Sequence, residues 1–422
     1  MGLLLGRFVL AGTGDPSPSR PAPQAGGSAE ATVAALQGQL RATPDNPDLL
    51  TKLGVSYITR ARETADPSFY TKAAQALDRS QSLGPDRPLT LTGLGLLALS
   101  RHDFLAALDF GRRGHAINPD SPDPLGVIVD AQVELGRYDE AAGTAQQMLD
   151  RRPSIASLSR ASYLRELNGD VPGAITAMTQ AVVAGAGAAA DIAYVQTLLG
   201  DLHLAAGQLT RAEGAYRAAL DRQASYGAAD YGLARVAAAG GDLDGAAKLL
   251  DDLVARLPQP AYVALAGDVA AAQGRTADAA AQYDLVRQIE ALNRANGVSV
   301  DLELARFEAD HARDPGADPE AAVSLARTAL AQRPTVFGED TLGWALRQAG
   351  HPAEALTHAR AAVRLGTADA LLPYHLAVIE ADLGMTDAAR TDLSAAMSLN
   401  RYLTLRDLPD ARALAARLGL PT

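Results

Sequence analysis

The sequence contains few of the residue patterns that catalysis or metal binding requires. Seven histidines occur among 422 residues, and none belongs to a His-Glu-x-x-His arrangement, in which two ligands would share one helix face. His351 and His358 are seven residues apart, which predicts two surface or groove residues rather than metal ligands. The chain has no cysteine, which excludes disulfides, thiolate metal sites and cysteine nucleophiles. We expect a protein that is not an enzyme and binds no metal, with an unrecognised enzyme as a minor alternative.

Two further segments have the composition of a ligand site without the context that such a site needs. Residues 184–190 contain Gly185, Gly187 and Ala190 at the spacing of a dinucleotide fingerprint, which requires a strand before it and a helix after it. The residues before it are typical of a helix, so we expect a loop insertion and no cofactor. The acidic loop 314–319 has too few carboxylates at alternate positions for an EF-hand and is interpreted as a solvated turn.

A helix–turn–helix pattern of small residues recurs along most of the chain. In its clearest copy, Leu135 closes an apolar face, Gly136 can end the helix in the left-handed conformation, and Ala141 allows the next helix to pack closely. The equivalent alanine returns at intervals of 33 to 43 residues, at Ala73, Ala107, Ala141, Ala174, Ala212, Ala246, Ala279, Ala322, Ala355 and Ala389. A glycine stands five residues before it at Gly136, Gly169, Gly207, Gly241, Gly274, Gly350 and Gly384. A proline follows twelve residues after it at Pro85, Pro119, Pro153, Pro258 and Pro334.

Helix–turn–helix units with this period are typical of the tetratricopeptide repeat. The chain resembles that family over nearly all of its length past the first thirty residues. The resemblance implies an all-α, right-handed superhelical solenoid of about ten helix pairs, with an N-terminal half repeat and a C-terminal capping helix. We divide the chain into an apolar stub and proline-rich linker (1–27), the solenoid (28–400) and the capping region (401–422).

The intervals that differ from 34 predict where the repeats are irregular. Sixteen residues separate Tyr57 from Ala73 where the family pattern has nine, which predicts a longer first helix in repeat one. The interval of 43 residues before Ala322 predicts a turn at Asn296-Gly297 and a separate helix over residues 300–311. A last helix is expected over residues 408–418, where it would cover the end of the stack.

The resemblance also nominates binding residues, because in that family the first helix of each repeat lines a concave groove. Transferring the groove positions to repeats five to ten gives Tyr194, Asp201, Tyr231, Arg235, Asp268, Arg306, Asp340, Trp344, Arg347 and Tyr374. Tyr, Trp and Arg are enriched at binding hot spots, which makes these repeats the expected site for a protein or peptide partner. An alternative interpretation is that Trp344 and Phe337 merely pack between repeats. The chain has only three lysines, none at a groove position, so the family's Lys/Asn clamp for a terminal carboxylate is not supported.

Net charge limits the classes of partner. The formal charge of −11 argues against nucleic acid, whose phosphates need a basic surface. No feature indicates a small-molecule substrate. The favoured function is therefore a protein–protein interaction scaffold that holds a segment of its partner in the groove. The alternative is a structural solenoid that self-associates.

The composition and the first residues bear on origin and location. Few lysines, with abundant alanine and glycine, look like a bacterial coding sequence of high GC content. Residues 1–11 are apolar apart from Arg7 and lead into a segment rich in proline. Eleven residues cannot span a bilayer, but such a stub resembles the end of a signal peptide or membrane anchor. This pattern favours the cell envelope, and the alternative is a cytoplasmic protein with a plain N-terminal tail.

Overall fold

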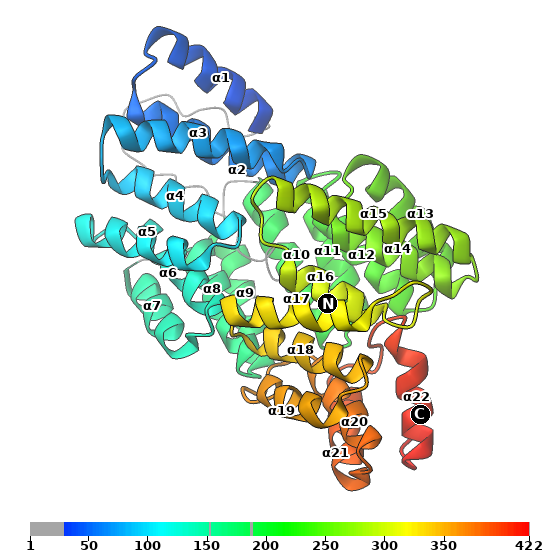
Figure 1. Ribbon diagram of the computed structural model, residues 1–422. Helices are drawn as coiled ribbons and strands as arrows, with labels where there is room; N and C mark the ends of the chain where they lie inside the picture. Colours follow the sequence, from blue (N-terminus) through cyan, green and yellow to red (C-terminus); the bar gives the residue numbers. More distant parts are fainter. Residues whose placement is uncertain (1–28, 152, 186–188, 422) are drawn as a thin grey trace.

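The computed structural model describes residues 29–151, 153–185 and 189–421, and all regular structure in them is α-helical (Figure 1). Ten antiparallel helix pairs follow one another, with α1 (Ala29–Ala42) before them and α22 (Asp407–Arg417) after them. This arrangement confirms the expected all-α solenoid. The predictions for residues 1–27 lie outside the described residues, as does the centre of the glycine-rich segment, residues 186–188.

The first helices of the pairs lie on the inside of the superhelix and the second helices on the outside (Figure 1). The first helices are α2 (Pro47–Thr64), α4 (Pro88–Ser100), α6 (Asp123–Glu134), α8 (Ile155–Leu167), α10 (Ala189–Ala205), α12 (Gly227–Ala239), α14 (Pro260–Ala272), α16 (Asp301–Asp310), α18 (Val336–Gln348) and α20 (Leu371–Asp382). The second helices are α3 (Ser68–Leu83), α5 (Phe104–Ile117), α7 (Tyr138–Arg151), α9 (Val171–Ala184), α11 (Leu209–Arg222), α13 (Leu243–Arg256), α15 (Thr276–Ala295), α17 (Pro319–Gln332), α19 (Pro352–Ala362) and α21 (Thr386–Leu399).

The phased alanines and glycines have the roles that their spacing predicts. All ten alanines lie in second helices, and none is more than 3% exposed, because each faces the first helix of its own or the next pair. All seven phased glycines have positive φ, between +67° and +86°. In repeat two His102 stands at this position and takes the same left-handed conformation, with φ of 62°.

The irregular intervals are accommodated by helix length. The first helix of repeat one, α2, has 18 residues, whereas α12 and α14 have 13 each. The long interval before Ala322 contains a 20-residue α15, the turn at Gly297 and the 10-residue α16. The expected insertion around residues 184–190 is only partly a loop, because α10 resumes at Ala189 and has 17 residues.

The superhelix is wound so tightly that its second turn packs on its first. Backbone and side-chain contacts join residues 196 to 200 positions apart, such as Glu134 to Arg333, Leu167 to Thr367 and Leu204 to Asn400. Helices α18–α20 accordingly pack against α6–α8 (Figure 1). We call this line of contact the seam. In it, the turns that follow α4, α6, α8 and α10 meet the connections that precede α16, α18, α20 and α22.

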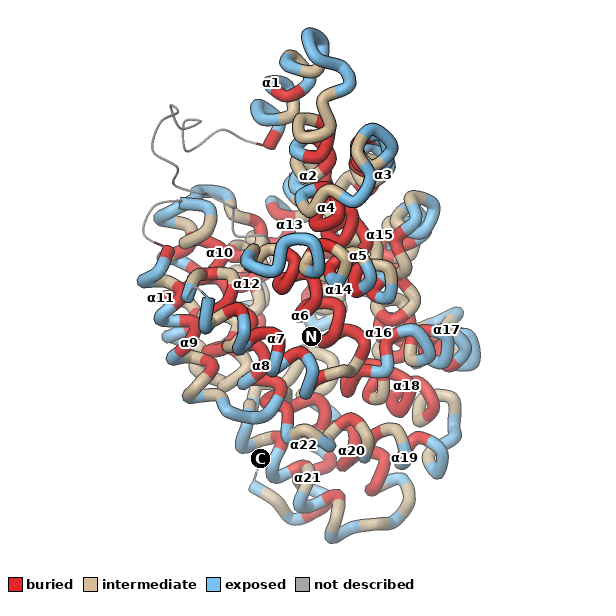
Figure 2. The backbone as a smooth tube through the Cα atoms, turned by 90° about the vertical axis from the view of Figure 1, so that its left-hand side faces the viewer, coloured by how far each residue is buried: buried red, intermediate tan, exposed pale blue. Residues whose placement is uncertain are grey.

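The seam changes which faces of the first helices are buried (Figure 2). In α6, every residue from Pro124 to Glu134 is buried, and in α18 only Glu339 escapes burial between Val336 and Leu346. In α12, which lies away from the seam, only five residues are buried, and all five are glycine or alanine. Contact between the turns therefore leaves the inner surface accessible mainly in the middle repeats.

Candidate protein-binding site

The ten groove residues expected from the sequence fall into two groups in the structure. The side chains of Tyr194, Arg306, Asp340, Trp344 and Tyr374 are buried, each less than 9% exposed. The side chains of Asp201, Tyr231, Arg235, Asp268 and Arg347 are partly exposed. The first group, Tyr194 apart, comes from repeats eight to ten beside the seam, and the second comes mainly from repeats five to seven.

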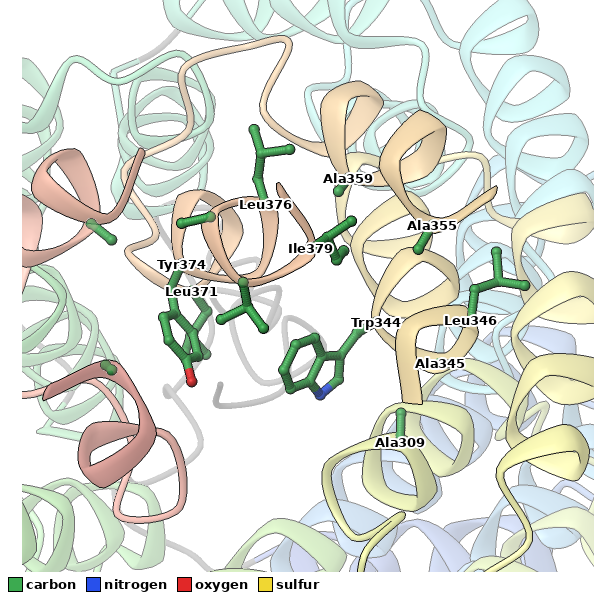
Figure 3. Packing of buried hydrophobic residues seen from close by; sticks show 14 of the residues in the cluster. Ala309, Trp344, Ala345, Leu346, Ala355, Ala359, Leu371, Tyr374, Leu376 and Ile379 are labelled. Carbon is green, nitrogen blue, oxygen red and sulfur yellow. The ribbon is translucent and has the colours of Figure 1, made fainter. Parts of the chain in front are cut away.

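Trp344 packs between repeats nine and ten. Its ring stacks on that of His375 with centroids 4.1 Å apart and an interplanar angle of 16°. Trp344 and Tyr374 belong to the hydrophobic cluster that joins α18, α20 and α22 (Figure 3). Phe337 is also buried, in the cluster that links α18 to α6 and α8 across the seam. In the free chain both aromatic residues therefore serve inter-repeat packing, the alternative that the sequence left open.

Arg306 and Asp340 form a buried charge network rather than a pair of exposed contacts. The Arg306 Nε donates to Asp310 Oδ2 at 2.9 Å, and its Nη1 donates to Asp340. The other carboxylate oxygen of Asp340 lies 2.8 Å from His375 Nδ1. Burial alone would lower the pKa of Arg306, but Asp310 and Asp340 outweigh it and hold that pKa above its ordinary value. The Arg306 guanidinium is thus engaged by two carboxylates inside the protein, and the network links repeats eight to ten.

A second network, in repeats five to seven, reaches solvent. Arg235 Nη1 donates to Asp201 Oδ1 at 2.9 Å, and the Tyr216 hydroxyl donates to the same oxygen at 2.8 Å. The guanidinium of Arg235 lies 5.6 Å from the Tyr231 ring centroid, and the Tyr231 ring lies 4.6 Å from that of Tyr262. Since the side chains of Asp201 and Arg235 are 19% and 24% exposed, a partner can approach this pair directly.

Asp268 belongs to a third group, which includes residues that the sequence analysis did not select. The Tyr283 hydroxyl donates to Asp268 Oδ1 at 3.0 Å, and His311 Nε2 lies 3.3 Å from the same oxygen. Burial and the charge of Asp268 raise the pKa of the Tyr283 hydroxyl, so it stays protonated at neutral pH. Arg406, from the connection before α22, completes the group. Spacing could not reveal Arg406, because it lies outside the repeats.

Neither a metal cluster nor a membrane span is found among the described residues. No three His, Asp or Glu side chains lie close enough to hold a metal ion there. Within the same residues no helix is both long and apolar enough to cross a bilayer.

Comparisons with known proteins identify the repeats. Residues 127–189 and 197–261 match the family model described as tetratricopeptide repeat. No curated protein sequence matches the chain. A human IFIT1 dimer solved with m7Gppp-AAAA is 14% identical, with a TM-score of 0.50, over 80% of this chain and 77% of that chain. The APC/C hetero-tetramer Cut9-Hcn1 is also 14% identical, with a TM-score of 0.42, over 92% and 93% of the two chains.

The likeness to the IFIT1 structure concerns the fold alone, because the identity is low. The RNA in the IFIT1 structure belongs to that protein, and the exclusion of nucleic acid as a partner of this chain stays a prediction from its negative charge. The two matched stretches cover most of α6–α9 and of α10–α13. The remaining pairs continue the same geometry with the same phased alanines. Residues 127–189 and 197–261 are thus tetratricopeptide repeats, and they lie within a helical-repeat scaffold of the kind that mediates protein interactions.

Proposed function

We propose that the chain is a non-enzymatic scaffold that binds an extended segment of a partner protein on the inner surface of repeats five to eight. The observation that carries this proposal is the contrast between first helices. Helices α10, α12 and α14 leave Asp201, Tyr231, Arg235 and Asp268 partly exposed, whereas α6 and α18 bury nearly every residue. Aromatic, acidic and arginine side chains on one accessible surface suit a segment of mixed charge.

The partly exposed ion pair between Arg235 and Asp201 supports this surface as the binding site. The two side chains keep contact with water at 24% and 19% exposure, so part of each charge remains open to a partner. A bidentate contact between a carboxylate of the partner and Arg235 would strengthen binding. The ring of Tyr231 beside it offers apolar area with little rotamer entropy to lose.

Affinity measurements on variants test the proposal. A partner isolated from the source cell with the wild-type chain is reduced to its bound segment, and that segment is titrated against Tyr231→Ala and Arg235→Ala. Each variant is expected to lose about 2 kcal/mol of binding free energy, roughly thirtyfold in affinity per folded molecule, with the folded fraction taken from its melting curve. Arg217→Ala on the outer helix α11 is the control, because the Arg217 side chain is 70% exposed and pairs only with Glu213. Equal affinities in all three variants would place the site elsewhere.

Trp344→Ala gives a separate test of the division between packing and binding. Because Trp344 is 4% exposed, its loss leaves a cavity and should lower stability by about 3–5 kcal/mol. The affinity per folded molecule should not change. Loss of affinity at unchanged stability would return Trp344 to the binding site.

Self-association remains the alternative function. Light scattering at several concentrations separates the two, since a scaffold for a partner should stay monodisperse while an assembly unit grows with concentration.

A further inference from the structure

The connection between α21 and α22 crosses the inner surface of the middle repeats. Asn400 Nδ2 donates to the Leu204 carbonyl of repeat five at 3.0 Å. Leu405 packs against the buried cluster of repeats six and seven that contains Ala234, Leu250 and Val269, the same cluster against which Tyr231 packs. The chain then reaches Arg406, which binds groups of repeats seven and eight. Residues 400–407, which we call the C-terminal segment, therefore occupy part of the surface proposed for the partner.

Arg406 inserts its guanidinium into a site built from several elements. Its Nε donates to the Asp310 carbonyl at 3.2 Å, its Nη1 donates to the Tyr283 hydroxyl at 3.2 Å, and its Nη2 donates to Asp314 Oδ1 at 2.9 Å. Asp268 Oδ1 lies 3.7 Å from Nη1. We call Asp268, Tyr283, Asp314 and the Asp310 carbonyl the arginine socket. These contacts come from three different nitrogens of one planar guanidinium. A lysine ammonium has a single nitrogen and cannot reach all three acceptors, so lysine cannot substitute.

The socket has hydrogen-bonding capacity that Arg406 does not use. The second carboxylate oxygen of Asp314 is buried and has no hydrogen-bond partner. A guanidinium that enters at a different angle could pair with both oxygens of Asp314, the bidentate geometry that gives the strongest arginine–carboxylate contacts. Arg406 remains 24% exposed and its contact with Asp268 is long, so its fit leaves room for a better ligand.

The C-terminal segment is held in a strained conformation, whereas α22 is anchored independently. Leu403 has a φ of +37°, which costs a branched non-glycine residue conformational energy. Helix α22 packs through Ala411, Leu414 and Leu418 into the cluster that contains Tyr374 of α20. The Arg406 side chain can therefore leave the socket while α22 stays in place.

Resting on the proposed scaffold function, we propose that the C-terminal segment is an internal ligand of this surface. The partner is a protein segment with an apolar residue followed by arginine, which takes the places of Leu405 and Arg406. The chain's negative net charge favours the approach of such a basic segment. Binding of the partner then has to displace Arg406. The C-terminal segment therefore lowers the apparent affinity of competing ligands, and only a ligand that binds more tightly than the segment replaces it.

The socket can be tested without any partner. In Arg406→Ala the socket is empty, and N-acetyl-arginine amide is titrated while the melting temperature is followed. The amide should raise the melting temperature of Arg406→Ala by several degrees at millimolar concentration, and N-acetyl-lysine amide should not. Arg401→Ala is the matched control from the same segment, because Arg401 is exposed and its guanidinium contacts the neighbouring Tyr402, with the hydroxyl at 3.2 Å and the ring centroid at 5.2 Å. If the arginine amide raises the melting temperatures of both variants equally, the socket is not an arginine site.

A peptide tests the displacement itself. A synthetic peptide with the sequence of residues 401–408 should bind Arg406→Ala at least tenfold more tightly than it binds the wild type, and a version with alanine at its second arginine should bind neither. Should Arg406→Ala be too unstable, Arg406→Lys keeps the charge, vacates most of the socket and should give the same ranking. Equal affinity for wild type and variants would overturn the internal-ligand proposal. Positive socket results with no effect of Tyr231→Ala on the natural partner would instead contradict the proposed function.

Discussion

The turn glycines of repeats three to five and those of the later repeats have the same backbone conformation but different surroundings. A Cβ added at Gly136 would lie 2.3 Å from the Pro334 carbonyl oxygen, and one at Gly169 would lie 2.5 Å from the Gly366 carbonyl oxygen. A Cβ at Gly241, Gly274, Gly350 or Gly384 would meet nothing within 4 Å. In every copy the glycine ends a helix, but only at the seam does its missing side chain also allow a distant segment of backbone to pack closely against it. One sequence signal thus has a second role that depends on the superhelix.

The same contrast applies to charges. At the seam, Arg333 is 4% exposed and bridges Glu134 and Glu303, with distances of 2.6 and 2.8 Å. Its guanidinium also lies 5.0 Å from the ring centroid of Phe104. On the outer surface, Arg327 and Glu354 join neighbouring repeats through side chains that are 55% and 46% exposed. The buried bridge holds two turns together, whereas water competes for the exposed pair.

The largest effect is expected from Arg333→Ala. It leaves Glu134 and Glu303 without their shared cation in a buried position, which typically costs about 3–5 kcal/mol. The matched control, Arg327→Ala, should cost about 1 kcal/mol or less. Urea unfolding measures both, and small-angle scattering should show an expanded particle only for Arg333→Ala. Equal costs would mean that the seam contributes nothing beyond ordinary contacts between repeats.

Gly136→Ala and Gly274→Ala form the next test. Both alanines must adopt positive φ, which costs roughly 1–2 kcal/mol. At Gly136 the new methyl group also collides with Pro334, and overpacking of this kind adds about 1–3 kcal/mol. The difference between the two midpoints of denaturation isolates the seam, because the backbone term cancels. A difference near zero would show that the turns separate easily.

Thr367→Val probes one hydrogen bond across the seam. The Thr367 hydroxyl donates to the Leu167 carbonyl at 2.7 Å, and both groups are buried. Replacing the hydroxyl by a methyl group leaves this carbonyl unsatisfied, at a cost of about 1–2 kcal/mol. Thr328→Val removes an exposed hydrogen bond within α17. It should change the free energy of unfolding by only a few tenths of the cost expected for Thr367→Val. Thermal unfolding of the pair gives the comparison.

The smallest expected effect is the pH dependence of the free energy of unfolding. His102 lies at the seam with its Nδ1 3.8 Å from Glu303. Burial lowers the pKa of His102 below its ordinary 6.5, and Arg333 lowers it further, although Glu303 and Glu134 act in the opposite direction. The unfolded chain therefore binds this proton more readily than the folded chain does. Protonation of His102 does not reduce the free energy of unfolding above the pKa of the unfolded chain, but reduces it as the pH falls from there through the pKa of the folded chain.

His102→Asn should remove that pH dependence, because asparagine tolerates positive φ and does not titrate. The wild type is expected to lose up to about 1 kcal/mol more than the variant between pH 7.5 and 5.5. Stability curves measured at several pH values, with His351→Asn on an exposed residue as the control, make the comparison. Parallel curves for wild type and His102→Asn would contradict the assignment.

The sequence alone was sufficient for the repeat architecture. Ala141 and its equivalents, with Gly136 and its equivalents, specify helix packing and helix ends through local sterics, which do not depend on distant residues. The same reasoning found the long α2 and the separate α16, since extra residues in a helical pattern lengthen or divide a helix.

The proposed binding site was less predictable. The family positions all lie on first helices, but Trp344 and Asp340 are buried whereas Tyr231 and Arg235 are partly exposed. That difference depends on contacts between residues about two hundred positions apart, and it results from small rotations summed over many repeats. No local sequence pattern predicts the result of these summed rotations. The sequence therefore determined each repeat and its order, whereas only the tertiary structure decided which inner surfaces close against the next turn and where Arg406 comes to lie.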